Sequence, residues 1–540
     1  MASAIDPRAA PAREGRISDD ASPGGPAARL RRRRAAAARW RKRQISRRLA
    51  KLRDTAKRAA RRARDGWIGL KGWQRHWIVN IGIGLTIELV LHATASVPIV
   101  TAAQNLTMDA AMQAQSAFPS ALRPSTPITF IDVDAATWRD PSWGGGRPYV
   151  APREKLAALI DYAFRHDARI VVLDVAVDEP PTPGDAELVR FLDTLAKPGD
   201  LKPEQQLLVI RTIDSAAELA QPTASPSDLQ ISDELRPSPL EAALVRDAAH
   251  VHETAPYFET SRDGVLRDWR LWRSACQRDT PAGAGHWRVI PSVQLAVAAM
   301  LRDPAWSAPW PPQTNAGACL VDFGALGQVG TLTTQDEIDR RARDAVAPHR
   351  QITHHAKIEG SADDGVDPSS RIFYRWRWGA SASPIPTISA TEALSGVGPA
   401  GHAWFHEGVV VIGQSFADAR DMHATPLGAM PGSLVLANAI GSILDYGVIQ
   451  PPNQQIRLLI TAGLIVAVGL VFALLDSFQA TLATLAIFLP LVVITEYGLL
   501  TAGYWLDFAV PLLGIYLHRL FAALHEYAVL RRPGEHSHGH

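Results

Sequence analysis

Hydrophobic residues are distributed unevenly along the chain. One long apolar segment covers residues 77–99, three more cover 457–475, 480–500 and 504–524, and a mostly polar stretch lies between the first and the second. Each segment is close to the length that crosses about 30 Å of hydrocarbon at about 1.5 Å per helical residue. The pattern predicts four transmembrane helices, one before and three after a single large domain at 100–450.

Within that domain the hydrophobic period alternates between the two expected for strands and the 3.6 expected for helices. Buried strands are predicted at 128–134, 169–175, 207–210 and 408–414, a half-exposed strand at 264–272, and helices at 154–163, 186–195, 291–301 and 433–444. Residues 213–248 are rich in Pro, Ser and Ala and are expected to form an excursion. The sequence therefore predicts an α/β fold, with a mixed or mostly parallel sheet flanked by helices.

Charge sets the expected orientation. Residues 29–75 contain 20 Lys and Arg against two acidic residues, a local charge of +18, whereas the whole chain carries only +2, so the remainder sums to about −16. Positive residues near a span resist translocation. We therefore expect a protein of a bacterial inner membrane with the N-terminus and the tail 525–540 in the cytoplasm and an acidic domain in the periplasm. The segment 77–99 is too long for the core of a signal peptide and is expected to remain as an anchor.

The residues before the first span form two parts. Residues 1–28 carry too little apolar surface to fold and are predicted to be disordered. The arm 29–76 is predicted to be partly helical. Its basic residues and one tryptophan are expected to contact anionic lipid or a partner protein; they are Arg31, Arg32, Arg33, Arg34, Arg39, Trp40, Arg41, Lys42 and Arg43. The alternatives are that the arm only fixes topology, or that it binds nucleic acid, which is disfavoured because no base-reading fold accompanies the charge.

Three further residues stand out by their position. Cys276 and Cys319 lie in the domain expected to be exported, where an oxidising compartment permits a disulfide; two buried free thiols are the alternative. Glu88 lies near the middle of the first span, where a carboxylate facing lipid would cost about 2.5–3.5 kcal/mol. We expect it to contact another helix, in this chain, in a partner or in a homo-oligomer, the alternative being a tolerated residue without a role.

Several segments in order are similar to one known family. They are Phe130-Ile131-Asp132-Val133-Asp134, the strand 168–175, the turn Asp263-Gly264-Val265-Leu266-Arg267 followed by 291–296, and above all 409–415, 421–428 and 430–440. Together with the one-plus-three arrangement of spans over 77–525, these segments resemble the type-two CHASE domain, a cyclase/histidine-kinase-associated sensory extracellular domain. The resemblance implies a periplasmic sensory role and supplies no known ligand.

The family commonly continues into an effector domain after the fourth span, and the 16 residues that follow here are too few to fold one. We therefore expect a sensor or regulator without catalytic output of its own, acting through a partner protein in trans. The alternative is a structural scaffold subunit of an envelope or secretion complex. An enzyme is not expected, because no complete catalytic set is present.

Candidate ligand-binding residues are acidic. Asp132, Asp134 and Asp174 lie at the carboxyl ends of two predicted strands, where open α/β sheets bind their ligands. Asp263, Arg267, Asp418 and Asp421 belong to the segments most similar to the family and are candidates for the same site. Oxygen ligands of this kind suit a divalent cation such as Ca²⁺ or Mg²⁺. The alternative is that these carboxylates cap helices and hold loops, with no cofactor bound.

Overall fold

The computed structural model describes the chain in ranges separated by gaps. The described residues are 65–93, 97–117, 125–146, 151–178, 184–195, 201–214, 230–231, 234–238, 240–241, 250–278, 285–304, 306, 320–321, 370–379, 385–396, 404–416, 420–449, 453–475, 478–486 and 504–505, with 50, 51, 53, 55, 57, 58, 61 and 62. Contacts divide the chain into two units, Met1–Val79 and Asn80–His540. The site and its surroundings lie in the second unit.

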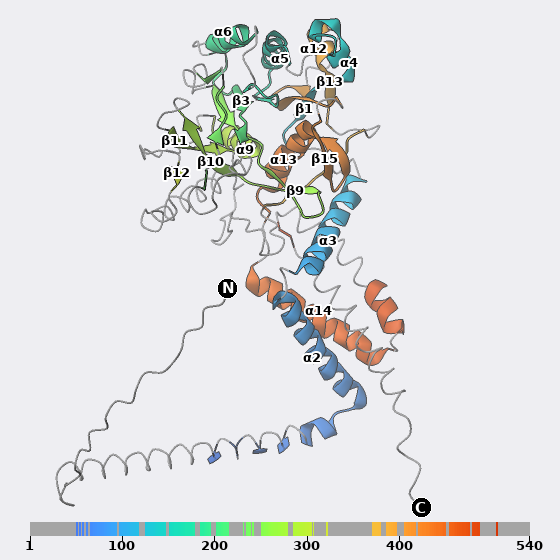
Figure 1. The fold of residues 1–540 in the computed structure, drawn as a ribbon. Helices are drawn as coiled ribbons and strands as arrows, with labels where there is room; N and C mark the ends of the chain where they lie inside the picture. The colour runs from blue at the N-terminus through green and yellow to red at the C-terminus, as the bar shows by residue number, and fades with distance from the viewer. Residues whose placement is uncertain are drawn as a thin grey trace, which may run out of the picture. The chain divides into compact units, whose positions relative to one another are not determined.

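A six-stranded sheet forms the centre of the second unit (Figure 1). In spatial order its strands are β13 (Thr387–Ser389), β1 (Ile128–Val133), β14 (Val409–Gln414), β2 (Ile170–Leu173), β3 (Gln206–Ile210) and β7 (Val251–Thr254). Every neighbouring pair is parallel. The predicted α/β fold with a mostly parallel sheet is confirmed, and β14, the last of these strands in the chain, lies between the first two.

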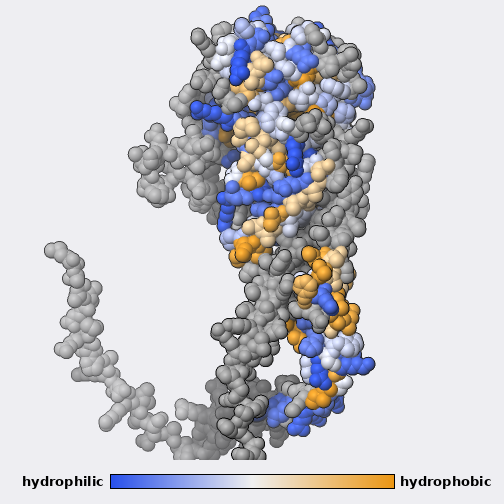
Figure 2. Space-filling model, turned by 90° about the vertical axis from the view of Figure 1, so that its right-hand side faces the viewer, coloured by the Kyte–Doolittle hydropathy of each residue, from blue (hydrophilic) through white to orange (hydrophobic). Residues whose placement is uncertain are grey.

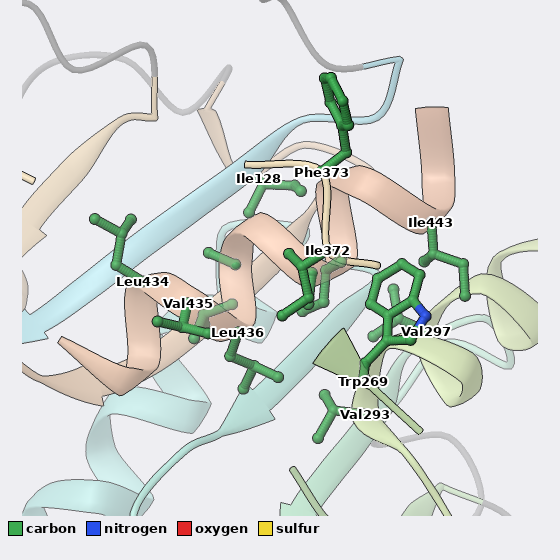
Figure 3. Packing of buried hydrophobic residues seen from close by; sticks show 14 of the residues in the cluster. Ile128, Trp269, Val293, Val297, Ile372, Phe373, Leu434, Val435, Leu436 and Ile443 are labelled. Atoms are coloured by element: carbon green, nitrogen blue, oxygen red, sulfur yellow. The ribbon is translucent and has the colours of Figure 1, made fainter. Parts of the chain in front are cut away.

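Helices cover both faces of this sheet, and alternate strand residues point to opposite faces. On β1, Ile128 and Phe130 belong to one hydrophobic cluster, and Ile131 and Val133 belong to another. The first cluster is completed by α9 (Val293–Arg302) and α13 (Gly432–Tyr446), the second by α5 (Arg153–Arg165), α6 (Asp185–Leu195) and α12 (Ala390–Ser395). Figure 3 shows side chains of α9 and α13 meeting around Ile372 in the first cluster.

The helix α3 (Pro98–Ser116) packs against the first cluster through Met108 and Met112, which are almost fully buried. Pro98 opens the helix at a position where a missing N–H costs nothing. The main-chain N–H of Tyr374 donates to Met112 Sδ at 3.2 Å. Helix α3 and the segment 371–377 therefore belong to the core of the domain.

Smaller sheets surround the central one. A four-stranded sheet contains β11 (Gly285–Pro291), β10 (Trp272–Arg278), β6 (Glu234–Leu235) and β4 (Ile213–Asp214); the two-stranded pairs are β12 (Leu320–Val321) with β5 (Gln230–Ile231), β15 (Met422–Thr425) with β16 (Gly428–Pro431), and β8 (Phe258–Thr260) with β9 (Leu266–Trp269). The short helix α4 (Ala135–Arg139) and the 3-10 turn η2 (Pro141–Trp143) follow β1. The excursion predicted at 213–248 thus contributes β4, β5 and β6 to these sheets.

One predicted helix start was wrong. The sequence placed Pro291 at the beginning of a helix, whereas Pro291 is the last residue of β11 and the helix begins at Val293. Ser292 caps the helix, since its Oγ accepts a hydrogen bond from the N–H of Leu295 at 3.3 Å. Pro291 therefore precedes the cap, and the Ser292 hydroxyl, which satisfies a free N–H of the first turn, marks the start of the helix.

Two helices coincide with parts of the predicted membrane spans. They are α2 (Gly72–Ala93) and α14 (Gln454–Leu474). Large apolar side chains on both are exposed, for example Leu89 and Leu459 at 69% and 73%. In the described ranges, no helix combines the length and the apolar character needed to cross a membrane. The four predicted spans are therefore not supported by these ranges and stay a prediction, and most of 480–500 and 504–524 lies outside them.

Candidate functional site

Three neighbouring strands of the central sheet end in a row of residues that face α13. Asp132 of β1 is paired in register with Gly413 of β14, and Asp174 follows directly after Leu173, the β2 partner of Ile412. Because successive residues of a strand face opposite sides of the sheet, Asp132, Gly413 and Asp174 all lie on the face covered by α13. Two carboxyl groups therefore flank a glycine at the carboxyl edge of the sheet, where parallel α/β folds bind ligands.

The first turn of α13 lies directly on that glycine. A Cβ added at Gly413 would come within 2.1 Å of Ser433 Oγ and 2.5 Å of Ser433 Cβ, so only glycine fits between strand and helix. Ser433 Oγ also accepts a hydrogen bond from the N–H of Gln414 at 3.2 Å. The positive end of the α13 dipole is thus held between Asp132 and Asp174, an arrangement that favours negative charge on both.

Asp132 is 5% exposed and incompletely hydrogen-bonded. Its Oδ2 accepts from Ser415 Oγ at 2.6 Å, whereas its buried Oδ1 has no hydrogen-bond partner among the described residues. Burial raises the pKa of Asp132 to about 7, with a further rise from the charge of Asp134, although the hydrogen bonds from Ser415 lower it. This carboxyl group can therefore gain or lose a proton near neutral pH.

Asp174 lies in a second group of titratable residues at the same edge. Burial raises the pKa of Asp174 to about 6; the Ser433 hydroxyl lowers it, the charge of Asp421 raises it and His423 lowers it. His423 Nε2 lies 2.8 Å from Asp421 Oδ1, and this hydrogen bond raises the pKa of His423 although burial opposes it. Asp132 on one side and Asp174, with its neighbours, on the other therefore flank the start of α13. The N–H of Gly432, the first residue of α13, donates a hydrogen bond to the Asp421 carbonyl at 2.9 Å.

The remaining acidic candidates separate into different places. Asp134 caps α4, because its Oδ1 accepts from the N–H of Thr137 at 2.7 Å. Asp263 and Arg267 lie in the β8–β9 hairpin, where Arg267 also contacts Asp109 of α3. Of the predicted residues, the structure brings together Asp132 with Asp134 and Asp174 with Asp421, and it places Asp263 and Arg267 in the separate contact with α3.

Several predicted residues lie outside what the structure describes. Asp418, Cys319 and the arm residues 31–43 fall in the gaps, and the side chains of Cys276 and Glu88 are likewise not described. Among the residues with described side chains, no three acidic, histidine or cysteine groups are placed to hold a metal ion. The divalent-cation prediction stays untested, and the chemistry the edge offers is proton binding and hydrogen bonding.

Sequence reasoning missed a buried ionic network beyond this edge. Arg211, the residue after β3, is fully buried and donates to Asp178 Oδ1 at 2.9 Å; it also pairs with Glu253 of β7. The Arg211 guanidinium donates to the carbonyl of Arg236 at 2.7 Å as well. One feature of the sequence could have indicated this network: Arg211 directly follows a buried strand and so lies at the same sheet edge as Asp132 and Asp174. Sequence alone gave no partners for it.

The fold and the edge define a parallel α/β domain with protonatable carboxyl groups at the strand ends. Comparison with family models matches residues 84–475 to the CHASE2 domain. The match covers most of the chain, so this protein belongs to the CHASE2 family, a family of sensory extracellular domains. The searches of curated proteins and of solved structures found no match.

Proposed function

We propose that the protein is a sensor or regulator of the inner membrane whose periplasmic CHASE2 domain detects a signal at the carboxyl edge and passes it through α13 to a partner protein in trans. One observation carries the proposal: α13 begins on Gly413 between Asp132 and Asp174, and α14 begins eight residues after α13 ends. A change in the charge or occupancy of the edge acts on the N-terminus of this helix. The domain itself carries out no catalysis in this proposal.

The far end of α13 is tied to α3. The hydroxyl of Tyr446, the last residue of α13, accepts a hydrogen bond from Gln115 Nε2 at 2.8 Å, and Asp445 forms an ion pair with Arg375. Helix α3 follows α2 in the chain as α14 follows α13. A displacement of α13 would therefore reach both helices that leave the domain.

The proposal places α2, α14 and the segments 480–500 and 504–524 in the membrane, with both termini in the cytoplasm. The basic stretch 29–75 supports this orientation and a contact with anionic lipid or with the partner. Topology is tested by inserting a reporter that is active only in the periplasm at 213–248 and, separately, after His540. We expect activity from the first fusion and none from the second; the reverse pattern would overturn the orientation.

Transmission is tested by cysteine accessibility in the full chain, in membranes, with Cys276 and Cys319 replaced by Ser. Gln455→Cys reports on the exposed first turn of α14, and Glu187→Cys on α6 serves as a control on the opposite face of the sheet. We expect Gly413→Ala, which displaces Ser433, to change the maleimide labelling rate of Gln455→Cys and not that of Glu187→Cys. Equal changes at both positions would indicate general loosening and contradict transmission.

The partner is sought by purification of the full chain in mild detergent followed by mass spectrometry. A sensor should bring down a protein with an effector domain, in amounts that change in Asp132→Asn or Gly413→Ala. A fixed set of stoichiometric envelope subunits, unaffected by both substitutions, would instead support the scaffold alternative.

A further inference from the structure

Helix α3 presents an apolar face to the outside of the domain. Ile99 and Leu106 are each 69% exposed, Ala110 is exposed and Ala103 is partly exposed. At 3.6 residues per turn these four residues lie within about 60° of one another, and Met108, which is buried in the core, points about 180° away from them. We call these four residues the α3 stripe. Figure 2 shows the stripe as part of a band of hydrophobic side chains that runs obliquely across this face.

This distribution is the reverse of that on an ordinary surface helix, whose polar residues face water. The polar residues of α3 are used against the domain: Asn105 accepts from Arg371, Asp109 pairs with Arg267, and Gln115 bonds Tyr446. Gln113, near the stripe, donates to the carbonyl of Pro426 at 3.0 Å. Three turns of apolar surface therefore face outward without a described partner. Exposing this apolar area to water is unfavourable in free energy, and a second helix that covered it would remove that penalty.

Spacing and charge indicate what the partner is. The stripe repeats at intervals of four, three and four residues, an average of about 3.7 that is close to the 3.6 residues of one helical turn, so the four side chains stay on one side of α3 and can face a second helix over three turns. Large and small residues alternate along it, so in a parallel pair, where each residue meets its counterpart, layers of Ile99 and Leu106 would alternate with layers of alanine that allow the two helices to approach closely. Asp109 is the only charged residue of α3 and is neutralised by Arg267, so two copies of the helix meet without like-charge repulsion.

We propose that α3 forms a parallel homodimer through this stripe, so that the partner is a second copy of this chain. The parallel orientation rests on the proposed membrane anchorage of α2, which ends five residues before Pro98 and would present α3 of both copies in the same direction. The contact joins the two α3 helices, and each α3 is bonded to the C-terminal end of its own α13. The dimer seam is therefore mechanically connected to the carboxyl edge of each domain.

The test is oxidative cross-linking of single cysteines in the full chain, in native membranes, with Cys276→Ser and Cys319→Ser as background. Ile99→Cys, Ala103→Cys, Leu106→Cys and Ala110→Cys are compared with Thr107→Cys, about 70° from the centre of the stripe, and with Glu187→Cys as a measure of random collision. Copies carrying two different tags are expressed together, so that a product containing both tags is a dimer. We expect at least a tenfold higher yield on the stripe than at either control position.

Leu106→Lys gives an independent measurement. Leu106 is largely exposed in one copy, so the substitution leaves the fold of the monomer intact, but a lysine on each helix would repel across the seam. We expect the Ile99→Cys cross-link to fall at least tenfold in this background with protease resistance unchanged. A flat profile along α3, products that never carry both tags, or a Leu106→Lys variant that cross-links like its parent would each overturn the proposal. Membrane fractionation of the same samples reports separately on anchorage, so a failure of the seam and a failure of the proposed function are distinguishable.

Discussion

Arg267 of β9 holds Asp109 of α3 by a two-pronged ion pair across 158 residues of sequence. Its Nε donates to Asp109 Oδ1 at 3.1 Å and its Nη2 to Oδ2 at 2.7 Å, while Nη1 donates to Asp263 at 2.7 Å. The side chains of Arg267 and Asp109 are 5% and 14% exposed, whereas that of Asp263 is 52% exposed. One guanidinium thus joins α3 to the domain through a mostly buried carboxylate and also binds an exposed carboxylate of its own hairpin.

The two carboxylates should contribute very differently to stability. We expect Asp109→Asn to lower the free energy of unfolding by about 3 kcal/mol, because it leaves the buried Arg267 charge without its main partner. Asp263→Asn should cost less than about 1 kcal/mol, since its carboxylate is exposed to solvent. Chemical denaturation of the purified full chain, monitored by tryptophan fluorescence, measures both. Equal losses would show that the Arg267–Asp109 pair does not anchor α3.

Gly413→Ala tests the contact between β14 and α13. The added methyl carbon would lie 2.1 Å from Ser433 Oγ, so the first turn of α13 must shift, at an expected cost of about 1–3 kcal/mol. Ser433→Gly in the same chain removes the side chain that the new methyl group meets. The double variant should therefore be more stable than the sum of the single changes, a coupling that a double-mutant cycle quantifies. Strict additivity would mean that the two residues do not share the contact.

The raised pKa of Asp132 predicts the sign of a pH effect on stability. Below pH 3.8 both the folded and the unfolded chain hold this proton, and well above pH 7 neither does; between these values the folded chain holds more, so stability falls as pH rises. Asn mimics the protonated form at every pH. We expect Asp132→Asn to stabilise the protein by about 1–3 kcal/mol at pH 8 and to change little at pH 4, measured by thermal unfolding at both values.

Asp140→Asn is the matched control for that measurement. Asp140 is partly exposed, and the hydrogen bond from Ser142 holds the pKa of its carboxyl group below the usual value. Its contribution is present at neutral pH and lost as pH falls through the lowered pKa, which is the opposite sign. This variant should therefore gain no stability at pH 8. A gain similar to that of Asp132→Asn would show that the effect arises from net charge rather than from burial.

The sequence was sufficient to predict four of the six strands of the central sheet, β1, β2, β3 and β14, but not the two strands at its edges, β7 and β13. Runs such as 128–134 and 408–414 are mostly apolar because helices cover both faces of the sheet, and this is a strong local signal. It also placed Asp132 and Asp174 at strand ends. It did not predict that β14 lies between β1 and β2, because spatial strand order depends on pairings between residues hundreds of positions apart.

The same limit explains what was missed at the site and in α3. Gly413 carries no signal by itself, and its role follows only from the position of Ser433 above it. Helix α3 was included in the domain without being recognised as a helix, because its outward face is as apolar as parts of its inward face and the amphipathic period is weak. Arg267 was predicted beside the acidic edge, whereas its partner Asp109 lies on an element that the sequence analysis had not separated.

The cysteine pair remains a prediction. Cys276 lies in β10, where its main chain pairs with Trp287 of β11, and Cys319 lies outside the described residues. If the two are bonded in an oxidising compartment, unreduced protein should migrate faster in a denaturing gel than reduced protein, and maleimide should label neither residue before reduction. Labelling of both in denaturant without reductant would show free thiols.

Glu88 offers a test of how α2 meets other helices. Gly84, four residues earlier in α2, lies so close to α14 that an added Cβ would come within 2.7 Å of Ile465 Cγ2. Residues four apart share a helix face, so we expect position 88 to lie at a helix contact. If a hydrogen bond forms there within the membrane, Glu88→Leu should weaken helix association by about 0.6–2 kcal/mol while insertion is unchanged. Glu88→Gln keeps the hydrogen-bonding capacity and should be much milder. Both are measured by the yield of the Leu106→Cys cross-link and by co-purification of the partner; wild-type behaviour of both variants would show that Glu88 has no role in the contact.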